Sequence, residues 1–127
     1  MTTTVRHIFG WKQEESLLPV LEELFGEPLQ KFEDRYSRWD YQTENYLIEL
    51  KSRMYPLTQD TYETWMIPVC KTTEVNKELA IFYNFEQDKS LFYIIYDKEQ
   101  FDTYKIVKNR YGQSTYLVPK SDFTQVR

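Results

Sequence analysis

The sequence is poor in the residues from which most metal and nucleophile sites are built, since its 127 residues include one cysteine, Cys70, and one histidine, His7. A lone cysteine cannot form an internal disulfide, which predicts a reducing compartment, and it excludes a zinc site made of cysteines. A lone histidine excludes a histidine-based metal site and a compact catalytic triad. A bound metal would therefore sit on carboxylates, which favours Mg²⁺ or Mn²⁺. We expect Cys70 to be a small buried side chain.

Long apolar runs are also missing. No stretch of about 18 successive apolar residues occurs, and the first twenty residues lack the apolar core of a signal peptide. We therefore expect a soluble, intracellular (cytoplasmic) protein with no membrane partner. Glycine is scarce, at 3 residues, whereas aromatic residues make up 17% of the chain, a composition that favours strands over loops. The length predicts a single domain over residues 1–127.

Charge is nearly balanced, with 16 basic and 20 acidic residues and a net charge of −4. This balance argues against a protein that coats nucleic acid through charge alone, although it allows a local basic patch. The charges are unevenly spread, because residues 103–127 carry five basic side chains against one acidic side chain. Tyr104, Lys105, Lys108, Arg110 and Tyr111 are interleaved there, a composition suited to binding a phosphate backbone with bases stacked on the rings. A charged edge strand that discourages aggregation explains it about as well.

The N-terminal part predicts an amphipathic helix that ends at Gly26. Apolar residues recur at intervals of three and four on one face, at Leu17, Leu18, Leu21, Leu24 and Phe25. Glu14 either lies within this apolar stripe or, if Ser16 is the N-cap ahead of Pro19, lies just before the first turn. It is a candidate site residue in both cases, and the alternative is a solvated glutamate at a frayed helix start.

The stretch from Trp39 to Arg53 places charge within an apolar strand. Tyr46–Leu50 would be an ordinary buried strand without Glu49, and Lys51 points to the same side because residues two apart share a face. A buried carboxylate is costly unless it is paired or binds a metal. The polar run 42–45 has turn character, and a hairpin there would place Asp40 beside Glu49.

An acid, a tight hairpin and Glu-x-Lys on an apolar strand resemble the active-site signature of the PD-(D/E)XK nuclease superfamily, which includes restriction-endonuclease-like and Holliday-junction-resolvase-like enzymes. The matching residues are Asp40, Glu49 and Lys51, with Leu50 between the last two, while Trp39 stands in place of the proline. The resemblance implies an α/β fold with a restriction-endonuclease-like core: an N-terminal helix, then a mixed central sheet with a second helix packed on it.

The resemblance also implies a function. It implies a Mg²⁺- or Mn²⁺-dependent endonuclease that hydrolyses phosphodiester bonds in DNA, with the metal held by Asp40 and Glu49 and with Glu14 as the extra acid from the first helix. Lys51 would orient the attacking water or stabilise the developing charge. A chain of this size would cut both strands as a homodimer, and a phage or viral source, with the host cell as its location, is consistent with this type.

Other interpretations remain open at this point. Glu49 and Lys51 would also suit a solvent-facing ion pair, and the whole chain a catalytically silent module that binds nucleic acid or protein. A weaker third possibility is a docking protein that uses the aromatic segment 79–96. Several basic residues are candidates for nucleic-acid contact, and each is also explained as a surface charge or as part of a charged edge strand: Arg53, Lys71, Lys105, Lys108 and Arg110.

The remaining segments predict further elements of the domain. We expect strands over 29–38, 62–67 and 115–118, a hairpin formed by 79–85 and 90–96, and a short helix over 68–77 that carries Cys70 and Lys71. The periodicity of 100–107 does not distinguish helix from strand.

Overall fold

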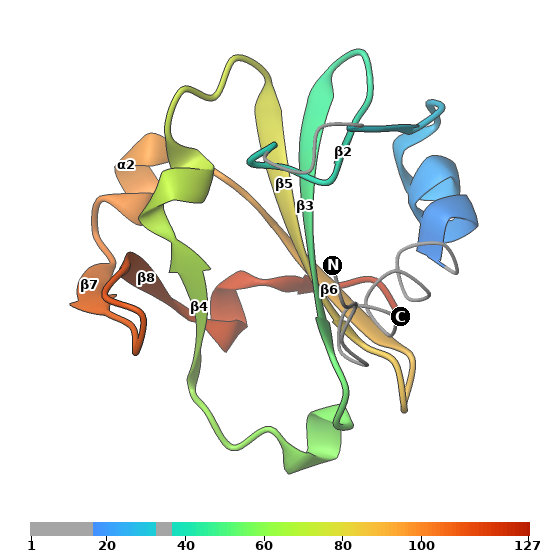
Figure 1. The fold of residues 1–127 in the computed structure, drawn as a ribbon. Coiled ribbons are helices and arrows are strands. Elements are labelled where there is room, and N and C mark those ends of the chain that lie inside the picture. Colours follow the sequence, from blue (N-terminus) through green and yellow to red (C-terminus); the bar gives the residue numbers. More distant parts are fainter. Residues whose placement is uncertain (1–16, 33–36) are drawn as a thin grey trace, which may run out of the picture.

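A computed structural model provides the structure of the chain and describes residues 17–32 and 37–127. These residues form an α/β fold with a mixed sheet at its centre (Figure 1). One face of this sheet carries a helix, and the other packs on a second, smaller sheet, so that two separate hydrophobic clusters form. The predicted α/β class is thereby confirmed.

The central sheet has six strands in the order β1-β2-β3-β5-β6-β9. Its two long central strands, β3 (Tyr46–Arg53) and β5 (Glu78–Phe85), run parallel, whereas all the other neighbours are antiparallel. Parallel neighbours are normally buried on both faces, and β5 accordingly reads as a continuous apolar run. The remaining strands are short or lie towards the edges: β1 (Gln30–Lys31), β2 (Tyr41–Gln42), β6 (Ser90–Ile95) and β9 (Thr124–Gln125).

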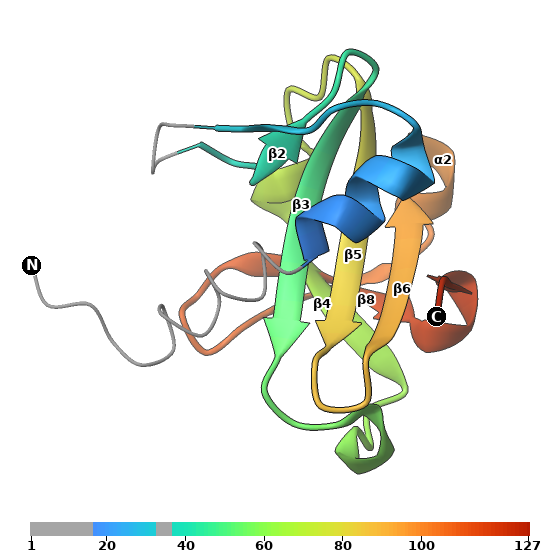
Figure 2. The same ribbon diagram turned by 90° about the vertical axis from the view of Figure 1, so that its right-hand side faces the viewer.

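A helix over residues 17–25 lies across β3, β5 and β6 (Figure 2). Leu17 and Leu21 are fully buried and pack with apolar side chains of the sheet. The helix ends at Gly26, which has a φ of +66° and donates its N–H to the carbonyl of Glu22 at 2.9 Å. A residue without a Cβ adopts this left-handed conformation without strain, so the predicted stop is confirmed.

The smaller sheet has the order β4-β8-β7 and is antiparallel throughout. Its strands are β4 (Thr64–Pro68), β7 (Lys105–Lys108) and β8 (Ser114–Pro119). Trp65 of β4 stacks on Tyr83 of β5, with 4.9 Å between the ring centroids, which joins the two sheets in one aromatic-rich core. Short helical turns connect the strands: η1 (Leu57–Gln59), η2 (Val69–Thr72), α2 (Lys98–Phe101) and η3 (Lys120–Asp122).

Several predictions from the sequence can be compared with these elements. The hairpin of β5 and β6 is confirmed. Segment 100–107 contains the last residues of α2 and then most of β7. The short helix expected over 68–77 is wrong, because Pro68 ends β4 and only Val69–Thr72 form a 3-10 turn. Valine and threonine in this segment disfavour an α-helix. Cys70 is exposed rather than buried.

Two further observations concern one predicted strand and membrane-spanning helices. The strand expected over 29–38 is described only in part, as β1, since residues 33–36 lie outside the described residues. Within the described part of the chain, no helix has the length and hydrophobicity needed to cross a bilayer.

Candidate active site

A tight hairpin between β2 and β3 brings Asp40 next to Glu49. The backbone N–H of Thr43 donates to the carbonyl of Tyr46 at 2.9 Å, and the Thr43 hydroxyl accepts from the N–H of Tyr46 at the same distance. These bonds close the turn as the polar run 42–45 predicted. The Asp40 carboxylate then accepts a 2.8 Å hydrogen bond from the N–H of Leu50 through Oδ2, which fixes it beside the strand.

Glu49, Lys51 and Arg53 lie on the face of β3 that is turned towards the smaller sheet. They alternate with the helix-facing Ile48 and Leu50 and follow Leu47, which belongs to the cluster between the two sheets. Glu49 is buried, with 4% of its surface exposed, and the two basic residues are partly exposed. The strand therefore presents one deeply buried acid followed by two cations that approach the surface.

The two carboxylates interact directly. Burial, and after it the charge and hydrogen bond of Asp40, raise the pKa of Glu49 to about 8, while Lys51 and Lys71 act in the opposite direction. At neutral pH, and without a cation beside it, the Glu49 carboxyl therefore tends to retain its proton. Burial lowers the pKa of Lys51, and the charges of Lys71 and Arg53 add to this effect.

Lys71 reaches this site from a different part of the chain. Its Nζ lies 2.7 Å from Glu49 Oε2 and also donates to the carbonyl of Arg38 at 2.5 Å. The η2 turn is held in place by Trp39, whose Nε1 donates to the carbonyl of Lys71 at 2.9 Å. From the sequence alone, an ordinary surface lysine is the favoured interpretation of Lys71 over contact with the substrate phosphate or the metal site, because nothing local indicates its proximity to Glu49.

The carboxylate oxygens of Asp40 and Glu49 are the kind of ligand that a hard divalent cation prefers. Glu49 Oε2 is buried and, apart from the ion pair with Lys71, has no aligned hydrogen bond with a described residue. Two adjacent carboxylates whose mutual repulsion raises a pKa are also a site that a cation would relieve. Among the described residues no group of three or more acids, histidines or cysteines is found, and Glu14, the predicted third ligand, lies outside the described residues.

Arg53 links the acidic pair to a large open cavity of about 710 Å³. Its guanidinium carbon lies 4.9 Å from the ring centre of Tyr83, and its side chain lines the cavity with Lys108 and Arg110. Of the predicted nucleic-acid contacts, the structure brings these three together. Lys105 does not line the cavity, because alternation along β7 turns it to the face opposite Lys108.

The cavity also contains two tyrosines, of which the sequence indicated Tyr111 but not Tyr62. Both line it and are strongly exposed, Tyr62 at 69% and Tyr111 at 73%. They lie 49 positions apart in the sequence, one before β4 and the other in the turn between β7 and β8. The composition of residues 103–127 indicated the basic side chains, but no local pattern indicates Tyr62.

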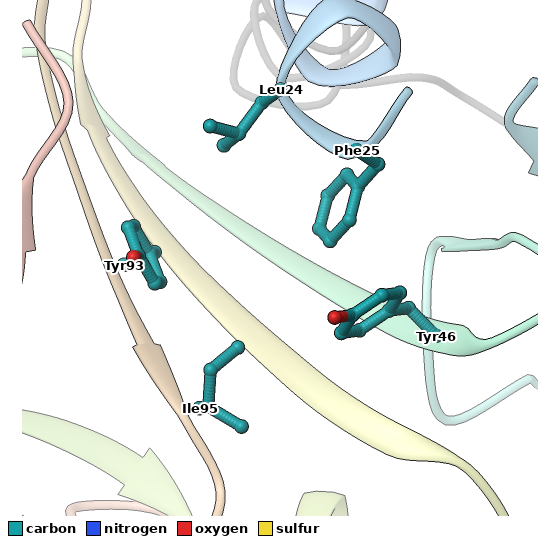
Figure 3. A pocket seen from close by; sticks show the side chains of 5 residues that line it. All are labelled: Leu24, Phe25, Tyr46, Tyr93 and Ile95. Atoms are coloured by element: carbon teal, nitrogen blue, oxygen red, sulfur yellow. The ribbon is translucent and has the colours of Figure 1, made fainter. Parts of the chain in front are cut away.

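A second cavity, of about 230 Å³, lies between the C-terminal end of the helix and the sheet (Figure 3). Leu24 and Phe25 point from the helix towards Tyr46, Tyr93 and Ile95 on the sheet. No carboxylate, amine or thiol lines it among the described residues, and it is separated from Glu49 by the sheet, because Tyr46 lies on the opposite face of β3. The acid–base groups are therefore concentrated on the other face.

Comparisons of the chain with protein-family models, with curated proteins and with solved structures gave no match. The function must therefore be inferred from the site itself.

Proposed function

We propose that the protein is a Mg²⁺- or Mn²⁺-dependent nuclease that hydrolyses phosphodiester bonds in DNA. The observation that carries the proposal is the contact of the Asp40 carboxylate with the buried Glu49, with Lys51 next on the same face of β3. Apolar side chains at these positions would stabilise the fold without the desolvation cost of a buried acid pair beside a lysine of lowered pKa. Such groups are a frequent feature of functional sites.

Each residue then has a role that follows from its position. Asp40 and Glu49 would hold the cation, with Glu14, which only the sequence indicates, as a third ligand; the N–H of Leu50 keeps Asp40 oriented. A bound Mg²⁺ supplies Lewis-acid activation of a water molecule and of the phosphate. The ammonium group of Lys51 orients the attacking water or stabilises charge on the phosphate oxygens. Arg53, farther along the same face, binds a neighbouring phosphate.

We extend the proposal to a restriction-endonuclease-like core. In support, a helix precedes the Asp40 hairpin and packs on one face of the sheet, and Glu49 and Lys51 lie on a strand that is central in a mixed sheet. The connection from β3 to the parallel β5 contains the strand β4 and the turn η2. The turn η2 lies where the second helix was expected. Lys71 enters the site because of this connection.

The test is cleavage of single-stranded, duplex and branched DNA in Mg²⁺ and in EDTA. We expect Glu49→Gln and Lys51→Met each to lower the rate by roughly 10²-fold or more, because each removes a group that acts in the transition state. Glu99→Gln and Lys98→Met serve as matched controls on the exposed helix α2. Equal activity of all five proteins would exclude this active site.

A catalytically silent binding module is a second candidate, and one observation favours it. Lys71 already lies against Glu49 Oε2, so this amine competes with a metal for the same oxygen. If the module is silent, Mn²⁺ will not bind to the wild type but will bind to Lys71→Ala in calorimetry, and DNA binding will persist in EDTA without cleavage. Binding of Mn²⁺ to the wild type, with cleavage, supports the nuclease.

The oligomeric state belongs to the same proposal. We propose a homodimer, because a domain of this size seldom covers both strands of a duplex. Light scattering of the protein with and without duplex DNA measures this directly. A monomer that cuts both strands in concert would contradict the dimer and leave the active site unaffected.

A further inference from the structure

We infer that the 710 Å³ cavity beside Arg53 binds a single nucleic-acid strand, with its phosphates on Arg53, Lys108 and Arg110 and its unpaired bases against Tyr62 and Tyr111. The inference rests on the proposed nuclease to the extent that the strand leads to Glu49 and Lys51. Binding itself requires no turnover.

The charge of the cavity is the first support. Three basic side chains line it and no aspartate or glutamate does, among the described residues, although the chain as a whole has a net charge of −4. None of the three basic side chains forms an ion pair with a described carboxylate. A local concentration of positive charge in an acidic protein is complementary to a phosphate backbone.

The exposed tyrosines are the second support. Tyr62 is 69% exposed and Tyr111 is 73% exposed, so two flat aromatic rings lie in water beside the cations. The guanidinium carbon of Arg110 lies over the Tyr111 ring, 4.9 Å from its centre, so a cation and a ring form one stacked pair. This pairing suits one nucleotide, whose phosphate meets the cation while its base stacks on aromatic surface.

The chemistry of the lining favours one strand over two. Tyr62 precedes β4 and Tyr111 lies in the turn between β7 and β8, so two separate segments each contribute an exposed ring to the cavity. A duplex already stacks its bases internally and offers only their edges, so aromatic faces gain contacts only from unpaired bases.

The cavity leads to the proposed active site along β3. Arg53 lines the cavity and follows Glu49 and Lys51 on one face of the strand, at about 13 Å and about 7 Å along the strand. A strand held at Arg53 therefore has its next phosphates near Lys51. The cavity would thus select a single-stranded segment, such as a flap or an unpaired branch, for cleavage.

The test is fluorescence anisotropy in EDTA with labelled oligothymidylate, oligouridylate and a duplex of equal length. We expect both single strands to bind more tightly than the duplex. Tyr62→Ala and Tyr111→Ala should each weaken single-strand binding by about fivefold or more, whereas Tyr62→Phe and Tyr111→Phe, which keep the ring, should bind like the wild type. Lys108→Ala should reduce the slope of log affinity against log salt by about 0.7, and Lys98→Ala on α2 should not.

Two results would overturn the inference: duplex binding as tight as single-strand binding, or alanine variants of both tyrosines that bind like the wild type. The outcome is separable from that of the nuclease test. Strand binding without cleavage in Mg²⁺ removes the nuclease and leaves the cavity. Cleavage that is insensitive to Tyr62→Ala and Tyr111→Ala removes the cavity and leaves the nuclease.

Discussion

The two faces of β3 are equally buried near its middle but are built from opposite chemistry. On the face covered by the helix, Ile48 is fully buried among leucine, alanine and phenylalanine side chains. On the other face, Glu49 is 4% exposed and is surrounded by Asp40, Lys51 and Lys71. One strand therefore contributes to the hydrophobic core through alternate residues and to a charged site through the others.

The difference teaches where the stability of this region comes from. Removal of apolar surface from water stabilises the helix-facing side directly, whereas the other side must overcome the desolvation of charges. Burial is the largest cause of the raised pKa of Glu49 and of the lowered pKa of Lys51. We therefore expect truncation on the apolar face to destabilise the fold and neutralisation on the charged face to stabilise it.

The largest effect is expected on the apolar face. Ile48→Ala should lower the free energy of unfolding by about 2–5 kcal/mol, because it leaves a cavity under the helix. Urea denaturation measures the change, and Ile48→Val, expected to cost about 0.5–1.5 kcal/mol, is the graded control. A loss below that of the valine variant would mean that the helix-facing cluster does not stabilise β3.

The opposite sign is expected one residue later. In EDTA, Glu49→Gln should stabilise the protein above pH 8 by about 1–3 kcal/mol, with the lost Lys71 pair offsetting part of the gain. A carboxyl with a pKa raised from 4.5 to about 8 binds its proton more tightly when folded, so stability falls as the pH rises through this window. Below pH 4.5 the two proteins should be equally stable in urea. A pH-independent difference would contradict the raised pKa of Glu49.

A divalent cation should reduce the difference between the contributions of the two faces to stability. Mg²⁺ at ten times its dissociation constant should stabilise the wild type by about 1.4 kcal/mol. We expect tighter binding at pH 8 than at pH 6, because the cation competes with the proton retained by Glu49. Thermal unfolding with and without Mg²⁺ measures this, and Glu49→Gln should show no shift. An equal shift in the glutamine variant would place the ion elsewhere.

The smallest effect on stability is expected where the charged face reaches the surface. Arg53→Met removes a partly exposed cation that lies over the Tyr83 ring, and it should cost no more than about 1 kcal/mol. The same variant should bind oligothymidylate more weakly. If its stability loss approached that of Ile48→Ala, the charged face would be structural along its whole length.

The sequence predicted the local features of this comparison. The polar turn over 42–45 placed Asp40 beside Glu49, and the alternation of β3 placed Lys51 and Arg53 on the same face as Glu49. Both depend on residues that are near one another in the chain, where turn chemistry and the two-residue period of a strand are decisive. The end of the helix at Gly26 was predicted for the same reason.

The parts that were not predicted depend on long-range pairing. Lys71 lies 22 positions after Glu49. It approaches Glu49 because the chain leaves the central sheet after β3, enters the smaller sheet as β4 and then returns to the central sheet as β5. The segment around Lys71 was expected to be helical, which gave no direction to this side chain. Tyr62 and Tyr111 line one cavity although they come from different segments of the chain, and no local pattern indicates that they share it.

The shortness of β2 has a consequence for solubility. Among the described residues, β2 pairs with β3 only as far as Ile48, the Asp40 carboxylate accepts from the N–H of Leu50, and no described strand pairs with the outer edge of β3 from there to Arg53. An open edge of this kind is a template on which a second chain can add a strand and start aggregation. Lys51 and Arg53 put positive charge along that edge, and two copies would bring like charges together. The cations that we propose act on phosphate would thus also keep the protein from aggregating through its own central sheet.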